Sequence, residues 1–275
     1  MNSKTNKSDL SAWIVRSRQA LLDRGVSNPQ QEIHWLLQSV GIPTNFHPAQ
    51  PSQLGQLNQR LARRLEGEPL AYILGNWSFM DLNLWVNQHV LIPRPETESM
   101  VEHILNHHSN HPLTVLELGI GSGAISCALA CARPHWQITA CDISKEALNV
   151  AKTNINNLEL EHQINLVYSH WFDEIDGQFD LIVTNPPYLS LVEYEERSAL
   201  LWEPKSALVS QENGIACYQE ILLNCRQFLK KGGTCYMEHG HQQFDAIKDI
   251  VLQHAFSRAD AGFDLSGKKR FIYFK

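Results

Sequence analysis

The sequence predicts an α/β protein, in which a mostly parallel β-sheet covered by helices follows a small helical bundle. Two observations predict this fold. From residue 113 onward, short apolar runs alternate with helical patterns, which is typical of a parallel sheet with helices on both faces. The first 75 residues show only helical spacing of apolar residues. With 43% hydrophobic and 19% charged residues, the 275-residue chain has a globular rather than a fibrous or disordered composition.

The N-terminal part predicts three helices, because apolar residues recur there at positions three and four apart. The helices are expected at residues 10–22, 29–40 and 51–65. Gly67 and Pro69 follow the third helix and end it. This part contains no catalytic motif.

Residues 70–93 differ in composition from the bundle before them. They are rich in aromatic and branched side chains around Gly75, which predicts a hairpin or an extended connector. A further helix then begins at Pro95. Glu96 and Glu98 in its first turn complement the positive end of the helix dipole.

The remaining chain alternates between strands and helices. Strands are expected at residues 113–118, 136–141, 164–168, 179–184, 233–239 and 270–274, and helices at residues 123–133, 144–157, 214–231 and 241–254. Ligands of such sheets bind beyond the carboxyl ends of the strands. The residues that follow each strand are therefore the candidates for function.

A glycine-rich segment, ELGIGSGA at 117–124, follows the first strand. Gly119, Gly121 and Ala124 satisfy the pattern GxGxxG/A, in which glycines permit a tight turn close to a ligand. Asp142 follows the second strand, where a carboxylate can accept hydrogen bonds from ribose hydroxyls or cap the next helix. Together they indicate a cofactor with a ribose, and they leave NAD and S-adenosylmethionine as alternatives.

The sharpest signal is Asn185-Pro186-Pro187-Tyr188 after the fourth strand. Two adjacent prolines provide no backbone N–H, so the local backbone presents mainly carbonyl acceptors. The Asn185 side chain adds another carbonyl, and Tyr188 offers a flat face. This combination suits a planar NH2 group, either a carboxamide or the exocyclic amine of a base.

The glycine loop, Asp142 and NPPY in this order resemble class I S-adenosylmethionine-dependent methyltransferases that modify planar NH2 groups. Further segments resemble the protein-(glutamine-N5) methyltransferases, and most closely the release factor glutamine methyltransferases. These segments are EPLAYILG at 68–75, LIPRPETE at 91–98, WEPKSAL at 202–208, EHGHQQ at 238–243 and the terminal GKKR. The resemblance covers residues 68–275. The N-terminal part resembles the family only in being helical.

The resemblance implies a Rossmann-like fold with a mostly parallel seven-stranded sheet. It implies a helical substrate-docking domain at 1–75, a hairpin or connector at 76–93 and a methyltransferase domain at 94–275. The implied reaction moves a methyl group from S-adenosyl-L-methionine, leaving S-adenosyl-L-homocysteine, to the amide nitrogen of a protein glutamine. The implied partners are class 1 peptide chain release factors, modified at their Gly-Gly-Gln motif.

The resemblance also assigns roles to residues. It implies that Asn185, Pro186 and Tyr188 are catalytic and that these three and Pro187 bind the substrate amide. The implied cofactor-binding residues are Gly119, Ile120, Gly121, Ser122, Gly123, Asp142, Trp171 and Asn185. Glu117 either meets the amino group of the cofactor or structures the loop. His170 stands where the family often has aspartate, and no residue is assigned as a base.

Three alternative functions remain. A ribosomal protein L3 glutamine methyltransferase shares the motifs but typically has PRSP where this chain has Arg94-Pro95-Glu96. An adenine-N6 nucleic-acid methyltransferase would need a basic surface, whereas residues 86–275 carry 15 basic and 23 acidic residues. A cofactor-binding protein without activity is disfavoured by the intact Asn185 and Tyr188.

Other partners are not expected. The net charge is −6, whereas nucleic-acid-binding proteins typically carry a strongly basic surface. His107, His108 and His111 lie close together, but no carboxylate or cysteine accompanies them in a metal-binding pattern. No apolar run approaches the ~18 residues of a membrane helix, and the N-terminal residues lack the apolar stretch of a signal peptide. A cytoplasmic protein is therefore expected.

Overall fold

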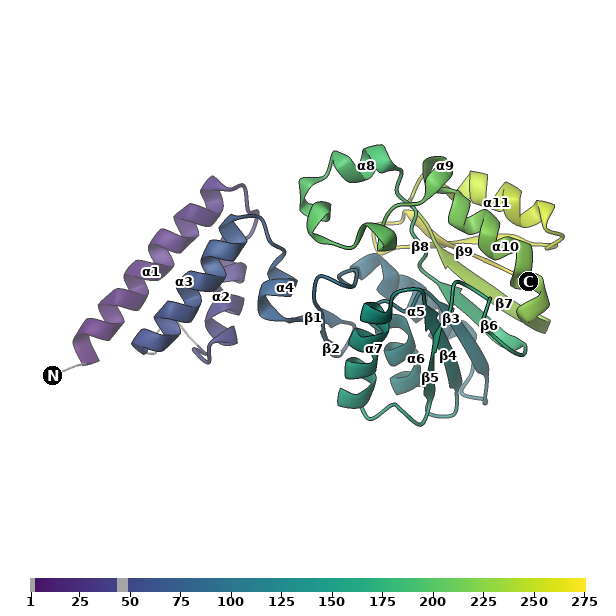
Figure 1. The fold of residues 1–275 in the computed structure, drawn as a ribbon, viewed down its shortest axis with the longest axis horizontal. Helices are drawn as coiled ribbons and strands as arrows, with labels where there is room; N and C mark the ends of the chain where they lie inside the picture. The colour runs from purple at the N-terminus through teal and green to yellow at the C-terminus, as the bar shows by residue number, and fades with distance from the viewer. Residues whose placement is uncertain (1–2, 44–48) are drawn as a thin grey trace. The chain divides into compact units, whose positions relative to one another are not determined.

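The computed structural model describes residues 3–43 and 49–275 (Figure 1). The chain divides into two compact units, Met1–Gly75 and Asn76–Lys275. Each has its own buried apolar core. They are described here one at a time.

The first unit is helical. Its helices are α1 (Ser3–Asp23), α2 (Pro29–Ser39), α3 (Pro51–Leu65) and α4 (Leu70–Leu74). Asn28 caps α2, because its side-chain oxygen accepts a hydrogen bond of 3.3 Å from the backbone N–H of Gln31. Apolar residues of all four helices form one core, including Leu21, Leu36, Leu57 and Ile73. The three helices expected before residue 66 are confirmed.

Helix α4 corrects the prediction of a hairpin or extended connector starting at residue 70. Pro69 precedes this short helix, and Gly75 ends it in the left-handed conformation with φ of 75°. Leu70 and Ile73 are buried in the core of the bundle. Tertiary burial on one face therefore makes this segment helical, despite its β-favouring composition.

The second unit begins with the expected hairpin. Strands β1 (Asn76–Phe79) and β2 (Leu82–Trp85) are antiparallel, with Phe79 opposite Leu82. Phe79 and Leu84 are fully buried in the core on one side of the main sheet. The hairpin therefore packs on this sheet as part of the same unit.

The main sheet has seven strands in the order β5-β4-β3-β6-β7-β9-β8. They are β3 (Thr114–Leu118), β4 (Gln137–Asp142), β5 (Ile164–Tyr168), β6 (Phe179–Thr184), β7 (Leu229–Glu238), β8 (Ala259–Phe263) and β9 (Lys269–Phe274). Neighbours from β5 to β7 are parallel, and β9 is antiparallel to both β7 and β8. This confirms the mostly parallel seven-stranded sheet.

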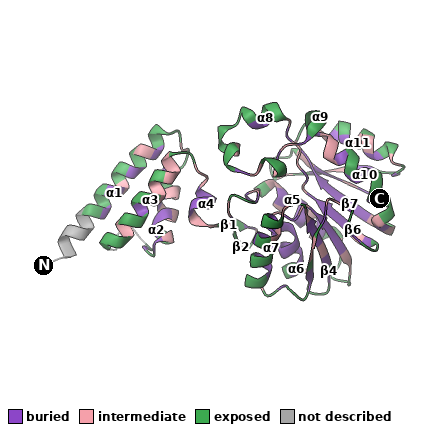
Figure 2. Cartoon of the chain, viewed as in Figure 1, coloured by how far each residue is buried: buried purple, intermediate pink, exposed green. Residues whose placement is uncertain are grey.

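Helices cover both faces of the sheet (Figure 1). On one face lie α5 (Pro95–His107), α6 (Ala124–Ala132) and α7 (Lys145–Asn157), and on the other lie α10 (Ala216–Phe228) and α11 (Phe244–Gln253). Figure 2 shows buried residues along the strands and exposed residues on the outer sides of these helices. The expected helix at 214–231 ends earlier, because residue 229 already begins β7.

A long segment connects β6 to α10. It contains α8 (Leu191–Glu195), two 3-10 turns at Ser198–Trp202 and Lys205–Ala207, and the short α9 (Gln211–Gly214). Among the described residues, no helix has both the length and the apolar character needed to cross a membrane.

Candidate functional site

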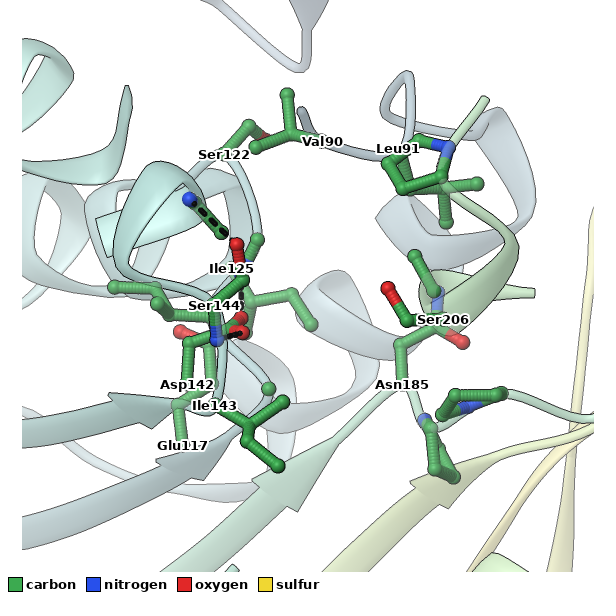
Figure 3. A pocket seen from close by; sticks show the side chains of 18 of the residues that line it. Val90, Leu91, Glu117, Ser122, Ile125, Asp142, Ile143, Ser144, Asn185 and Ser206 are labelled. Atoms are coloured by element: carbon green, nitrogen blue, oxygen red, sulfur yellow. Dashed lines mark hydrogen bonds between the residues drawn. The ribbon is translucent and has the colours of Figure 1, made fainter. Parts of the chain in front are cut away.

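A cavity of about 370 Å³ lies at the carboxyl ends of β3, β4 and β6, within the second unit. Here the strand order changes direction, since β4 and β6 flank β3 on opposite sides. Figure 3 shows Glu117 and Asp142 on one side of this cavity and Asn185 and Ser206 on the other. The cavity thus brings together the residues expected to bind a cofactor and the motif expected to bind a planar NH2 group.

The glycine loop forms one wall of the cavity. The backbone N–H groups of Gly119 and Ile120 both donate to the carbonyl of Cys141, each at 2.9 Å, which joins the loop to β4. Ile120, Gly121 and Ser122 line the cavity with Gly119. Gly123 lies behind them, where a Cβ would sit 3.6 Å from Ala151 of α7. Its φ of 86° is a left-handed conformation, which favours glycine at this position.

Asp142 ties the loop to the next turn. One carboxylate oxygen accepts from the backbone N–H of Gly121 and the other from that of Ser144, each at 2.9 Å. Burial raises the pKa of this carboxyl group. The cap of α7 is Ser144, whose hydroxyl accepts from Ala147 N at 3.1 Å. Asp142 thus orders the cavity wall and leaves further lone pairs for a ligand.

Glu117 is the most deeply buried acid of the cavity. Its Oε2 atom accepts from the backbone N–H of Ser126 at 3.0 Å and from the hydroxyl of the same residue. Burial raises the pKa of Glu117 to about 8, and the nearby Asp142 adds to this rise. A cation beside a buried acid of this kind stabilises its charged form. Glu117 therefore suits a cationic ligand group.

Asn185 is held by its nitrogen. Its Nδ2 atom donates to the hydroxyl of Thr97 at 3.3 Å, which leaves Oδ1 available as an acceptor. The preceding Thr184 donates to the carbonyl of Leu118 at 2.8 Å, so the ends of β6 and β3 are joined. Pro186 and Pro187 line the cavity beside Asn185. This wall presents acceptors and no backbone N–H from the prolines, as the sequence predicts.

Tyr188 has a different position from its neighbours in the motif. Tyr188 is not one of the described residues that line the cavity. Its carbonyl accepts from Gln243 Nε2 at 2.9 Å, and its ring packs against buried apolar residues. Burial raises the pKa of its hydroxyl above the ordinary value. The expected contact between Tyr188 and a planar substrate group stays a prediction.

Trp171 and Ile143 supply apolar surface to the cavity. The Trp171 indole donates to Glu220 at 2.9 Å, and its ring carbon lies 3.9 Å from where a Cβ of Gly119 would be. Ile143 lines the cavity and is 55% exposed. His170 lies 3.7 Å from Glu220. The sequence does not single out Ile143 or Glu220, because neither belongs to a motif.

The remaining wall consists of two segments that are distant in the sequence. Glu203 is only 5% exposed, and its carboxylate pairs with Arg94 at 2.5 Å and accepts from the backbone N–H of Ile92 at 3.0 Å. Arg94 lines the cavity together with Pro204 and Ser206. The ion pair therefore holds the segment before α5 against the segment after Trp202. No group of His, Cys, Asp and Glu able to hold a metal occurs among the described residues.

Comparisons with known proteins agree with this geometry. Residues 95–211 match the model of the methyltransferase small domain, and residues 12–75 match that of the PrmC N-terminal domain. A release factor glutamine methyltransferase from Salmonella typhimurium is 39% identical over 271 residues, which cover 95% of this chain and 97% of the relative.

Two further proteins are similar to this chain, one in sequence and one in fold. A bifunctional methyltransferase from Rickettsia bellii is 37% identical over 90% of this chain, and the chain spans about half (51%) of its length. A methyltransferase from Pyrococcus furiosus has a similar fold, with a TM-score of 0.54 at 17% identity, covering 79% of this chain and 98% of that one.

Proposed function

Because the chain belongs to the release factor glutamine methyltransferase family, we propose that it methylates the side-chain amide nitrogen of the Gly-Gly-Gln glutamine in class 1 peptide chain release factors. The methyl donor is S-adenosyl-L-methionine, and the product is S-adenosyl-L-homocysteine. One observation supports this most strongly: the Asp142 and Glu117 half of the cavity faces an Asn185 whose carbonyl oxygen is left available. Since release factors act in translation, the proposed location is the cytoplasm.

The lining of the cavity fits the cofactor by chemistry. Asp142 offers carboxylate lone pairs for the two ribose hydroxyls, and Glu117 offers a buried carboxyl group for the ammonium of the methionine part. Ile143 and Trp171 offer apolar faces for the adenine ring. The glycine loop permits close approach of its backbone, because Gly119 and Gly121 have φ of 75° and 54°.

The substrate amide is a poor nucleophile because its nitrogen lone pair is delocalised into the carbonyl. The cofactor supplies an electrophilic methyl group on a positively charged sulfur. Asn185 Oδ1 and the Pro186 carbonyl accept the two hydrogens of the substrate NH2, which orients the nitrogen toward the methyl group. The same acceptors stabilise the positive charge that develops on nitrogen as the N–C bond forms. As this bond forms, the C–S bond of the cofactor would break and leave a neutral thioether. The methylated, positively charged nitrogen is acidic, so it would lose one proton to water without a strong base.

The first unit is proposed to bind the body of the release factor. Helix α3 carries three neighbouring arginines, and each of them is engaged inside this unit. Arg64 pairs with Glu32 at 2.8 Å, Arg63 pairs with Glu68 at 2.5 Å, and Arg60 donates to a serine hydroxyl. The arginines therefore stabilise the bundle, and docking would rely on the exposed apolar residues of α1.

A methyl-transfer assay with labelled cofactor tests the function directly. Purified release factor, ribosomal protein L3 and duplex DNA are offered in parallel. We expect label only in the release factor, located by mass spectrometry on the Gly-Gly-Gln glutamine. Label in ribosomal protein L3 or in DNA, with none in the release factor, would support one of the alternative methyltransferases instead.

A second prediction concerns the cofactor. Isothermal titration is expected to show binding of S-adenosylmethionine and S-adenosylhomocysteine and none of NAD. The Asp142→Ala variant should bind both more weakly, by roughly 1.5–3 kcal/mol for each charge-assisted hydrogen bond to ribose that is lost. Asp249→Ala, which removes an exposed acid on α11, serves as the control and should bind normally. Binding of NAD without a response to S-adenosylmethionine contradicts the assignment.

A third prediction concerns Glu117. With a pKa of about 8, its carboxyl group is mostly protonated at pH 7 in the free protein. A cofactor ammonium beside it lowers this pKa, so binding should release about one proton at pH 7. Affinity should therefore rise as the pH is raised toward about 8, in the range where the cofactor amino group is still charged. Titrations in buffers of different ionisation enthalpy measure this release, which should vanish in Glu117→Gln. If wild type releases no proton, Glu117 only structures the loop.

A further inference from the structure

Thr97 contacts residues at the ends of two neighbouring strands, β6 and β7. It is in the first turn of α5, is 4% exposed and lines the cavity. Its hydroxyl meets Asn185 at the end of β6 and also hydrogen-bonds with Glu238 at the end of β7. None of the motifs in the sequence assigns a role to this hydroxyl.

The direction of these two hydrogen bonds decides which way the Asn185 amide faces. A threonine hydroxyl has one hydrogen, which it donates, and lone pairs that accept. When Glu238 is a carboxylate it can only accept, so Thr97 donates to it. The Thr97 oxygen is then left as an acceptor, and only the nitrogen of Asn185 can satisfy it. The carbonyl oxygen of Asn185 is thereby turned away from Thr97.

Resting on the proposed function, we propose that Thr97 is a positioning residue, which together with Glu238 keeps the carbonyl oxygen of Asn185 directed at the substrate NH2. A flipped Asn185 would instead present its own NH2 to the substrate NH2. Two donors would then face one another, and neither the alignment nor the charge stabilisation of the transition state would be available.

Glu238 is itself in an unusual position. It is 1% exposed, and its Oε2 atom has no hydrogen-bond partner among the described residues. Burial raises the pKa of this carboxyl group to about 7. The charged or titratable groups that face it from the elements around are Glu96, Arg94, Arg270, Tyr188 and Tyr218, whose hydroxyl donates to the Glu238 carbonyl at 2.8 Å.

Protonation of Glu238 should reverse the direction of both hydrogen bonds of the Thr97 hydroxyl. A proton on Oε2 would be a buried donor without an acceptor, so the proton is better placed toward Thr97. Thr97 then accepts from Glu238, and its own hydrogen turns to Asn185, which favours the flipped amide. The productive orientation is therefore present above a pH of about 7 and is lost as the pH falls below it.

Kinetics of three variants of the full chain test the inference. Thr97→Val keeps the shape of the side chain and removes the hydroxyl, and should lower kcat about ten- to hundredfold. The KM for the release factor and the affinity for S-adenosylmethionine should change less than about threefold, because the hydroxyl orients Asn185 rather than binding either substrate. Thr97→Ser, which restores the hydroxyl, should return kcat to within about threefold of wild type. Ser99→Ala removes another buried hydroxyl two residues further along α5 and should leave kcat unchanged.

A second measurement does not depend on activity. The side-chain NH2 signals of Asn185 in a 15N spectrum are identified by their loss in Asn185→Asp. They should move in Thr97→Val, stay in Ser99→Ala and titrate near pH 7 in the wild type. In Glu238→Gln this titration should disappear, together with the fall in kcat at low pH.

The outcomes separate the inference from the function on which it rests. A wild type that modifies no release factor overturns the proposed function, and the Asn185 signals then decide the role of Thr97 alone. An active wild type with unchanged kcat and unchanged Asn185 signals in Thr97→Val overturns the inference. If the Asn185 signals still titrate in Glu238→Gln, another group causes the titration, and Glu238 does not set the orientation of Thr97.

Discussion

We expect the Asn185→Ala variant to transfer methyl groups about two to three orders of magnitude more slowly than the wild type, as when one transition-state hydrogen bond is deleted. The reason is that Asn185 Oδ1 is the side-chain acceptor beside Pro186 in the cavity. Binding of S-adenosylmethionine should change much less, since the opposite wall with Asp142 and Glu117 remains. Single-turnover rates and isothermal titration measure the two effects separately.

A matched control is available on the surface. Asn149 is exposed on α7, and Asn149→Ala should leave both the rate and the cofactor affinity at wild-type values. If the turnover of Asn185→Ala stays within a few-fold of wild type, the assignment of Asn185 to the substrate amide is wrong. A parallel loss of cofactor affinity would point to a collapsed cavity instead.

The second large effect is expected from removal of the first unit. A chain of residues 76–275 keeps the hairpin, the sheet and the cavity, all of which belong to the second unit. If the first unit binds the release factor, kcat/KM on the full protein should fall by about two orders of magnitude, because remote binding energy is lost. Activity on a short Gly-Gly-Gln peptide should stay near its already low value.

The intact chain provides the counterpart to this truncation. Val15 and Leu22 of α1 are 69% and 44% exposed, and their spacing of two helical turns places them on one face. Val15→Ser with Leu22→Ser should reduce kcat/KM on the release factor while the peptide reaction is unaffected. Equal losses on both substrates in the truncated chain would mean that the first unit only stabilises the fold, and the docking role would be abandoned.

Local sequence patterns predicted most of the fold, and the exceptions share a cause. Six of the seven strands in the main sheet were predicted from apolar runs, and β8 (Ala259–Phe263) was not. This edge strand contains Gly262, where a Cβ would come within 2.0 Å of the Phe271 ring. The glycine permits the close approach of β8 to the Phe271 ring of β9, and a contact between two strands leaves no local sequence pattern. Helix α4 was missed for the same reason, since burial against the bundle decides its conformation.

What the sequence by itself determined is the set of residues at the ends of strands: the glycine loop, Asp142 and the NPPY segment. Their spacing and order identify them, because parallel strands bring their carboxyl ends to one edge. The tertiary structure alone decided how these residues are held. Thr97 and Asn185 are 88 positions apart and Arg94 and Glu203 are 109 positions apart, yet each pair is joined by a hydrogen bond. Such partners are set by how the sheet and its covering helices pack, so they leave no mark in the local sequence.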